Sequence, residues 1–225
     1  MKPYFFLLTL LASFATLQRS AQADAIYDVS INTSPLISNA AGPFSLDFQF
    51  TDGSGTGDGN NTATVSNFTF GAGSATGTPT TSGTVSGDLT SGFSLTDSNF
   101  FNEFTQTFTP GNELTFTVDL TTNVDAGGVP DEFSFDILDS TGSEIPTLGT
   151  FDYLLLADID SSQPTLYGYG SDTTRGTVTT GDSIDLPAPS ITSPVPEPAG
   201  VWLPACGLAF LGLRRCARVN SAAHS

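Results

Sequence analysis

Strict alternation of apolar and polar residues is the feature that most constrains how this chain can fold. In FSLDFQF, the residues Phe44, Leu46, Phe48 and Phe50 fall on one face and the polar residues between them on the other. A period of two places successive side chains on opposite faces of a β-strand, so the segment is predicted to be a half-buried strand. The same alternation recurs in LTFTVDL (114–120), FSFDI (133–137) and FDYLLLADI (151–159).

Helical periodicity is almost missing, and turn residues separate the alternating segments. Gly, Asp, Asn and Pro cluster in TDGSGTGDGNN, TPGN, DAGGVPD and DSTGS, which are typical turn sequences. The Gly- and Thr-rich stretch 71–92 is either a flexible insertion or a run of short edge strands. We therefore predict an all-β protein, a single antiparallel β-sandwich or jelly roll. Weaker strands are expected in 67–73, 83–97, 102–109, 164–170 and 176–180.

The first 23 residues have the three parts of a secretory signal peptide. Lys2 supplies the positive charge, 4–17 is apolar, and Ala21-Gln22-Ala23 offers a small-residue cleavage site. Gln18 and Arg19 end an apolar run that is too short to span a membrane comfortably. We expect signal peptidase to remove 1–23, so that the mature chain begins at Asp24.

The C-terminal region is organised in three further parts. A proline-spaced linker, PAPSITSPVPEP, is expected over 187–198 and leaves 24–186 as the body. The uncharged run 199–213 would reach about 22 Å as a helix, against roughly 30 Å of membrane hydrocarbon. Arginines follow it up to 218, and 219–225 is a short polar extension. This pattern favours a transient stop in the inner membrane over a permanent anchor. A glycolipid-anchor signal is the rival interpretation, although such signals normally end in the apolar tail.

This tail resembles the PEP-CTERM sorting signal of Gram-negative bacteria. The resemblance is carried by Pro196, Glu197 and Pro198, the short apolar segment, and the pair Arg214 and Arg215. It implies recognition by an exosortase, processing near the Pro-Glu-Pro motif, and delivery to the cell surface or the extracellular space. It also implies an organism that makes extracellular polysaccharide. The sequence departs from the usual pattern in the Trp, Pro and Cys residues inside the apolar stretch, and in the extension after the arginines.

The charge of the body is strongly one-sided. The chain has 23 acidic residues and six Lys and Arg residues. Only Glu197 of the acids lies in the tail, whereas Arg175 is the one basic residue between the leader and the tail. Such a surface repels nucleic acid and anionic membranes and attracts cations. Two interpretations are open, namely solubility of an extracellular protein and binding of a divalent metal.

The body offers little material for catalysis. It contains no His, Cys, Lys, Met or Trp, which excludes Ser-His-Asp and Cys-His mechanisms, lysine Schiff bases and zinc sites built on His or Cys. Carboxylate chemistry is what remains, and we predict that the protein is not an enzyme. A carboxylate-only glycosidase is the alternative. Its candidate acids are Glu103, Glu113, Asp131, Glu132 and Asp136.

One loop has a spacing that suggests calcium. In DGSGTGDGNN, Asp52, Asp58 and Asn60 alternate with glycines, and Gly57 lies where a calcium-binding loop turns sharply. The match fails at its last position, where Ala63 replaces the bidentate Glu. Calcium is thus the candidate cofactor, and a metal-free Gly/Asp hairpin loop is the alternative.

Two functional hypotheses follow beside the glycosidase. The leading one is an exported structural or adhesive protein of a polysaccharide-rich surface layer, sorted by its C-terminal tail. The alternative is a calcium-assisted carbohydrate-binding module. Its candidate sugar-facing aromatic residues are Tyr153, Tyr167 and Tyr169.

Overall fold

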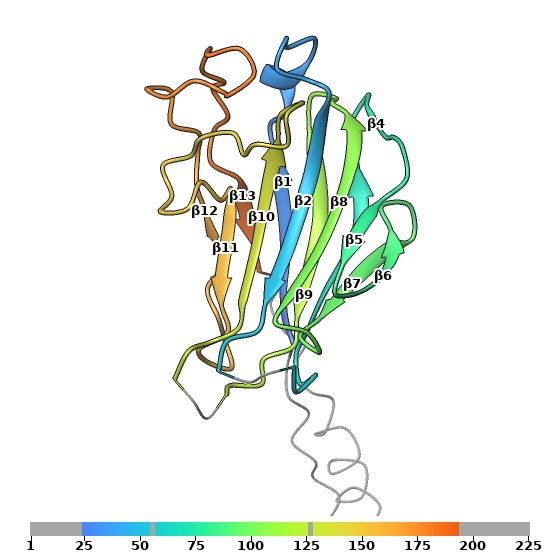
Figure 1. The fold of residues 1–225 in the computed structure, drawn as a ribbon, viewed down its shortest axis with the longest axis vertical. Coiled ribbons are helices and arrows are strands. Elements are labelled where there is room, and N and C mark those ends of the chain that lie inside the picture. The colour runs from blue at the N-terminus through green and yellow to red at the C-terminus, as the bar shows by residue number, and fades with distance from the viewer. Residues whose placement is uncertain (1–23, 55–56, 126–127, 194–225) are drawn as a thin grey trace, which may run out of the picture. The chain divides into compact units, whose positions relative to one another are not determined.

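The computed structural model describes residues 24–54, 57–125 and 128–193, and these form two antiparallel β-sheets packed face to face (Figure 1). The prediction of an antiparallel β-sandwich is confirmed. One short 3-10 helix, η1 (Ser34–Leu36), interrupts the strands near the start of the described chain. The expected signal peptide and the expected sorting motif at 196–198 and 214–215 lie outside the described residues. The described residues contain no helix that is long and apolar enough to cross a membrane.

The six-stranded sheet, here called sheet A, brings together strands from both ends of the body. Its central strand β9 lies between β1 and β3. The N-terminal strand β1 lies between β9 and β13, so it is an interior strand of the sheet. In spatial order, sheet A contains β13 (Ser190–Thr192), β1 (Ala25–Ile31), β9 (Leu114–Leu120), β3 (Thr62–Thr69), β7 (Gly92–Thr96) and β6 (Thr84–Asp88).

The seven-stranded sheet, here called sheet B, is built around β2, which lies between β10 and β8. Figure 1 shows these three long strands side by side, in front of β1 and β9 of sheet A. In spatial order, sheet B contains β12 (Tyr167–Gly168), β11 (Leu155–Asp158), β10 (Glu132–Leu138), β2 (Phe44–Thr51), β8 (Phe101–Thr109) and β4 (Ser74–Ala75), while β5 (Thr80–Ser82) also pairs with β8.

Phenylalanine rings from both sheets fill the space between them. Phe48 on β2 lies at the centre, with ring centroids 4.5 Å from Phe135, 5.1 Å from Phe93 and 5.4 Å from Phe116. Phe135 belongs to sheet B, whereas Phe93 and Phe116 belong to sheet A, so this cluster joins the two layers. Full burial of each such ring contributes about 1.5–3 kcal/mol to stability. The alternation seen in the sequence therefore forms the core as predicted.

One end of the sandwich, here called the loop end, collects the loops that concern function. Thr51 at the end of β2 pairs with Phe101 and Glu132, the first residues of β8 and β10. In sheet A, Ala25 at the start of β1 pairs with Leu120 at the end of β9. The β2–β3, β7–β8 and β9–β10 connections therefore gather at the loop end, at the bottom of Figure 1.

Three sequence predictions change in detail. The linker expected over 187–198 is partly structured, because Ser190–Thr192 form β13 by pairing with the open edge of β1. The strand expected over 151–159 is reduced to Leu155–Asp158, and Phe151 is 63% exposed instead of facing the core. No strand forms over 176–180. The stretch 71–92 contains short strands at the edges of both sheets, in agreement with one of its two interpretations.

Candidate metal centre

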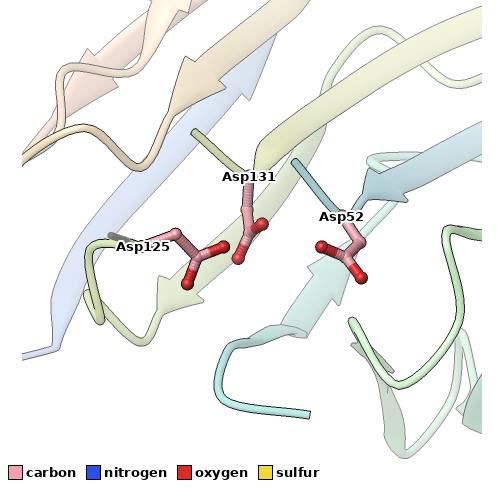
Figure 2. Close-up of side chains that lie close together, drawn as sticks. All are labelled: Asp52, Asp125 and Asp131. Atoms are coloured by element: carbon pink, nitrogen blue, oxygen red, sulfur yellow. The ribbon is translucent and has the colours of Figure 1, made fainter. Parts of the chain in front are cut away.

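Three aspartates from separate segments meet at the loop end. Asp52 follows β2, Asp131 precedes β10, and Asp125 lies in the connection after β9. Each offers one carboxylate oxygen, and these three oxygens lie within 4.8 Å of one another. Figure 2 shows the three carboxyl groups turned toward a common space. Asp52 and Asp131 are each only 1% exposed, whereas Asp125 is half-buried. We call this group the Asp cluster.

The pairing of β2 with β10 explains why Asp52 and Asp131 come together. The two strands are antiparallel, so the residue after one strand lies beside the residue before the other. Gly53 permits the close approach, because a Cβ added to it would lie 2.2 Å from the Pro130 carbonyl oxygen. Its backbone N–H donates to Asp131 Oδ1 at 2.8 Å. The glycine is therefore required for the geometry of the Asp cluster.

Asparagine amides hold the carboxylates in place. Asn61 Nδ2 donates to Asp131 Oδ2 at 2.7 Å and to the Asn123 carbonyl at 2.7 Å, while Asn61 Oδ1 accepts from the Asn123 backbone N–H at 2.9 Å. Asn60 Nδ2 donates to Asp125 Oδ1 at 2.7 Å. The β2–β3 connection is thus joined to the β9–β10 connection through neutral amides, which preserves the negative charge of the cluster.

A fourth carboxyl group, Asp97, lies against the same cluster. It is fully buried, and its Oδ2 accepts from the Asn61 backbone N–H at 2.9 Å. Burial is the main reason that the pKa of Asp97 rises to about 7. The Asn61 hydrogen bond lowers it, while the neighbouring carboxyl groups of Asp131 and Asp58 raise it further. The loop end therefore concentrates negative charge in a desolvated place.

Two buried oxygens at this end, Asp52 Oδ1 and Asn60 Oδ1, accept no hydrogen bond from the described residues, whereas Asp97 has a side-chain hydrogen bond to Asp131. An unpaired buried polar atom costs about 1–3 kcal/mol, and more when the group is charged. Buried polar atoms normally have a partner, so these two oxygens mark the loop end as a candidate site for a bound ion or water.

The described residues contain one basic side chain, and it is engaged elsewhere. Arg175 pairs with Asp152, donates to Asp172 Oδ2 at 3.1 Å, and donates to the Thr147 carbonyl at 2.9 Å. The Asp cluster therefore has no cationic side chain from the described chain beside it. Its charge can be balanced only by protons or by a bound cation.

The structure separates the residues of the calcium loop expected from the sequence. Asp52 belongs to the Asp cluster, and Asn60 lies beside Asp125. Asp58 is exposed, accepts from Asn60 Nδ2 at 2.7 Å, and is not a member of the cluster. The spacing did not indicate Asp125 or Asp131 as metal ligands. A usable signal is that one acid, Asp52, directly follows the strongly alternating strand β2, and another, Asp131, directly precedes the strongly alternating strand β10.

The acids considered for a glycosidase are dispersed over the fold. Glu113 accepts from the Ser30 hydroxyl at 2.6 Å, and Asp131 belongs to the Asp cluster. Glu103 is half-buried on β8, and Glu132 begins β10. Asp136 is 1% exposed in the middle of β10.

Asp136 and Asp47 form a second group of buried carboxyl side chains. The two residues are direct cross-strand partners on β10 and β2, on the face of sheet B that points away from the core. Asp47 accepts from Gln49 Nε2 at 2.7 Å and from the Thr105 hydroxyl at 3.1 Å, whereas no side chain of the described residues donates to Asp136. Burial raises the pKa of Asp47 to about 6 and that of Asp136 to about 9.

Two hollows lie on the surface of the described residues. The larger of these, of about 440 Å³, lies over β1, β9 and β13 of sheet A and is lined by apolar surface together with hydroxyl, amide and carboxyl groups. The smaller one, of about 110 Å³, adjoins the Asp cluster through Asp125 and is also lined by Val124, Val129 and Asp160. Of the tyrosines considered for sugar binding, Tyr167 is 55% exposed and Tyr153 and Tyr169 are half-buried, and none lines either hollow.

Comparisons of the chain with protein-family models, with curated proteins and with solved structures found no match.

Proposed function

We propose that the protein is an exported structural or adhesive β-sandwich of the cell surface, sorted by its PEP-CTERM-like tail and processed by an exosortase. The observation that carries the proposal is the tail, in which Pro196, Glu197 and Pro198 precede an uncharged run and the pair Arg214 and Arg215. The ends of the described body are compatible with it. Ala25 pairs with Leu120 at the loop end, and the Ser193 hydroxyl donates to the Ile26 carbonyl at 3.3 Å. A tail attached after Ser193 therefore leaves the fold beside the start of the mature chain.

Attachment through one end suits a display role. The opposite end and the outer faces of both sheets then remain available to the surroundings. The outer face of sheet A carries rows of hydroxyl groups, such as Thr69 and Thr115, whose oxygens are 2.7 Å apart. Together with the excess of acidic residues, this surface is well hydrated and repels other anionic surfaces, as expected for a component of a polysaccharide layer.

Expression of the full chain in a host that carries an exosortase tests the sorting proposal. The wild-type chain should reach the surface or the medium and should lack the mass of the tail. Glu197→Ala combined with Pro198→Ala should keep the tail, with Arg214 and Arg215 still present by mass spectrometry, and should remain in the inner-membrane fraction. Asp185→Ala is the matched control, since it removes an exposed acid just before the tail. Unchanged processing in the motif variant would contradict the proposal.

A carbohydrate-binding module is a second candidate, favoured by the hollow of about 440 Å³ on sheet A. Its lining of Asp28, Ser30, Asn67, Thr117 and Ser190 offers donors and acceptors that suit sugar hydroxyls. Binding of the full chain to a polysaccharide array, in calcium and in chelator, tests this role. Thr117→Val should remove such binding. Failure of the protein to bind any glycan on the array would eliminate the candidate.

A further inference from the structure

We propose that one calcium ion binds between the carboxylates of Asp52, Asp125 and Asp131 at the loop end and joins the connections of the two sheets. This site differs from the loop spacing found in the sequence, because its ligands come from two connections and Asp58 is not among them. It is also independent of the sorting proposal, because it concerns described residues of the body alone.

The first argument is the state of the Asp52 side chain. Asp52 is 1% exposed, and its Oδ2 accepts from the Gly57 backbone N–H while its Oδ1 has no partner. One Asp52 oxygen points toward Asp131 in Figure 2. A buried carboxylate oxygen facing two further carboxylates is repelled by both unless a cation lies between them.

The second argument is the way the other ligands are held. Asp131 accepts one hydrogen bond at each oxygen, from Gly53 N–H and from Asn61 Nδ2. Each carboxylate oxygen has a further lone pair, so these bonds orient the group without preventing coordination. Hydrogen bonds to ligating carboxylates commonly fix their orientation in metal sites. Asn60 Oδ1, which is buried without a partner beside Asp125, is an additional neutral oxygen donor.

The donor set selects the metal. All candidate ligands are oxygens, and the described body contains no His or Cys to favour zinc or copper. Calcium–oxygen distances of about 2.3–2.6 Å allow two ligands of one ion to be up to roughly 5 Å apart. The three carboxylate oxygens lie within 4.8 Å of one another, which is a separation that two ligands of one calcium ion can have. Magnesium requires a tighter and nearly octahedral arrangement.

Access and consequence follow from the position of Asp125. This residue is half-buried and lines the hollow of about 110 Å³, so an ion can enter from solvent and can keep water ligands on that side. Asp52 and Asp131 flank β2 and β10 of sheet B, whereas Asp125 follows β9 of sheet A. A bound ion therefore connects the two layers at the end where the described chain begins and ends.

Calorimetric titration of the purified full chain with CaCl2, after removal of metal by a chelator, tests the site. We expect one saturable site with a dissociation constant below about 1 mM, the upper limit for extracellular calcium modules. Asp125→Asn should weaken binding at least about tenfold, because it removes one ligand charge. Asp125 is half-buried, so this variant is the one least expected to disturb folding. Asp160→Asn is the matched control, since Asp160 lines the same hollow outside the cluster, and it should bind within about twofold of wild type.

Thermal unfolding gives an independent readout. Calcium should raise the melting temperature of the wild type and of Asp160→Asn by several degrees and should have little effect on Asp125→Asn. Equal shifts with calcium, magnesium and sodium would show screening of the acidic surface and would overturn the proposal. Wild-type affinity in Asp125→Asn would also overturn it. So would loss of binding in Asp58→Asn, since that result would place the ion in the loop 52–60.

Discussion

The Asp cluster at the loop end and the Asp47–Asp136 pair in the middle of sheet B are both buried groups of acids, but their surroundings differ. In the cluster, the carboxylates accept from backbone N–H groups and asparagine amides, as Asp131 does from Gly53 and Asn61. In the pair, no side chain of the described residues donates to Asp136. The first arrangement orients the carboxylate oxygens, whereas burial in the second favours a bound proton on Asp136.

The difference has its origin in the secondary structure. Within a β-sheet the backbone N–H groups are used by neighbouring strands, so they are not available to a carboxylate. In connections some of these groups are available. Asp139 shows this only three residues after Asp136, where the strand has ended. Burial by itself would raise the pKa of Asp139, but hydrogen bonds from Thr141 and Thr179 outweigh it and lower the pKa to about 2.

The largest effect is expected from Asp136→Asn. Burial, followed by the charges of Asp47 and Glu144, raises the pKa of Asp136 from 3.8 to about 9, so the folded protein keeps a proton that the unfolded chain loses. This contribution to stability is complete below the ordinary pKa and is lost as the pH rises toward 9, by about 1.4 kcal/mol per pH unit. Between about pH 5 and pH 8, the free energy of unfolding measured with urea should therefore fall by roughly 4 kcal/mol less in Asp136→Asn than in the wild type.

Asp47→Asn sharpens this measurement. The pKa of Asp47 is raised to about 6, so its own contribution is lost over a narrower window that ends near that pH. The substitution also removes a like charge beside Asp136 and should lower the pKa of Asp136. If Asp136→Asn and the wild type lost stability equally with rising pH, the protonated pair would be the wrong description.

A smaller loss is expected when the loop end is opened by Gly53→Ala. The added Cβ would lie 2.2 Å from the Pro130 carbonyl oxygen, so the connections that carry Asp52 and Asp131 must separate. We expect about 3 kcal/mol less stability, measured by urea unfolding in chelator. Gly128→Ala is the control, because its Cβ meets no atom within 4 Å and only its φ of +89° is unfavourable, at about 1 kcal/mol. Equal losses in the two variants would show that the close approach is unimportant.

Removal of the amide bridge should have an intermediate effect. Asn61→Ala deletes the group that donates to Asp131 and to the Asn123 carbonyl, and leaves these buried acceptors with fewer partners. The expected loss is about 2 kcal/mol in thermal or urea unfolding. Asn99→Ala is the matched control, since Asn99 is exposed and its amide donates to the Thr84 hydroxyl, and its cost should be below about 1 kcal/mol. A negligible change in Asn61→Ala would show that the bridge does not stabilise the loop end.

The smallest effect is expected from Asp139→Asn, and its pH dependence should have the opposite sign to that of Asp136. A lowered pKa contributes stability above the ordinary value of 3.8, and this stability is lost as the pH falls toward 2. The variant should therefore be about 1 kcal/mol less stable than wild type near neutral pH. The difference should shrink below about pH 4 in acid unfolding followed by circular dichroism. A difference that grows on acidification would contradict the assignment.

Part of the candidate site could be predicted from the sequence. Asp52 stood out because it opens a Gly/Asp loop after a strong strand, and the all-oxygen donor set pointed to calcium. Asp125 and Asp131 could not be connected with it, because a spacing rule compares residues within one loop. Their proximity depends on the pairing of β2 with β10, which joins segments about 80 residues apart in the sequence. Sequence alternation identifies the faces of strands and not their neighbours.

The sequence by itself determined the layered fold, because alternating residues such as Phe44, Leu46 and Phe48 can bury their apolar side only by facing a second sheet. It also determined that buried acids would lack basic partners, because Arg175 is the single basic residue of the body. The tertiary structure decided which acids meet, and it made a strand of Ser190–Thr192, inside the proline-spaced segment 187–198, because β1 offered an open edge. Both outcomes depend on strand pairing, which is a long-range contact that local residue patterns do not encode.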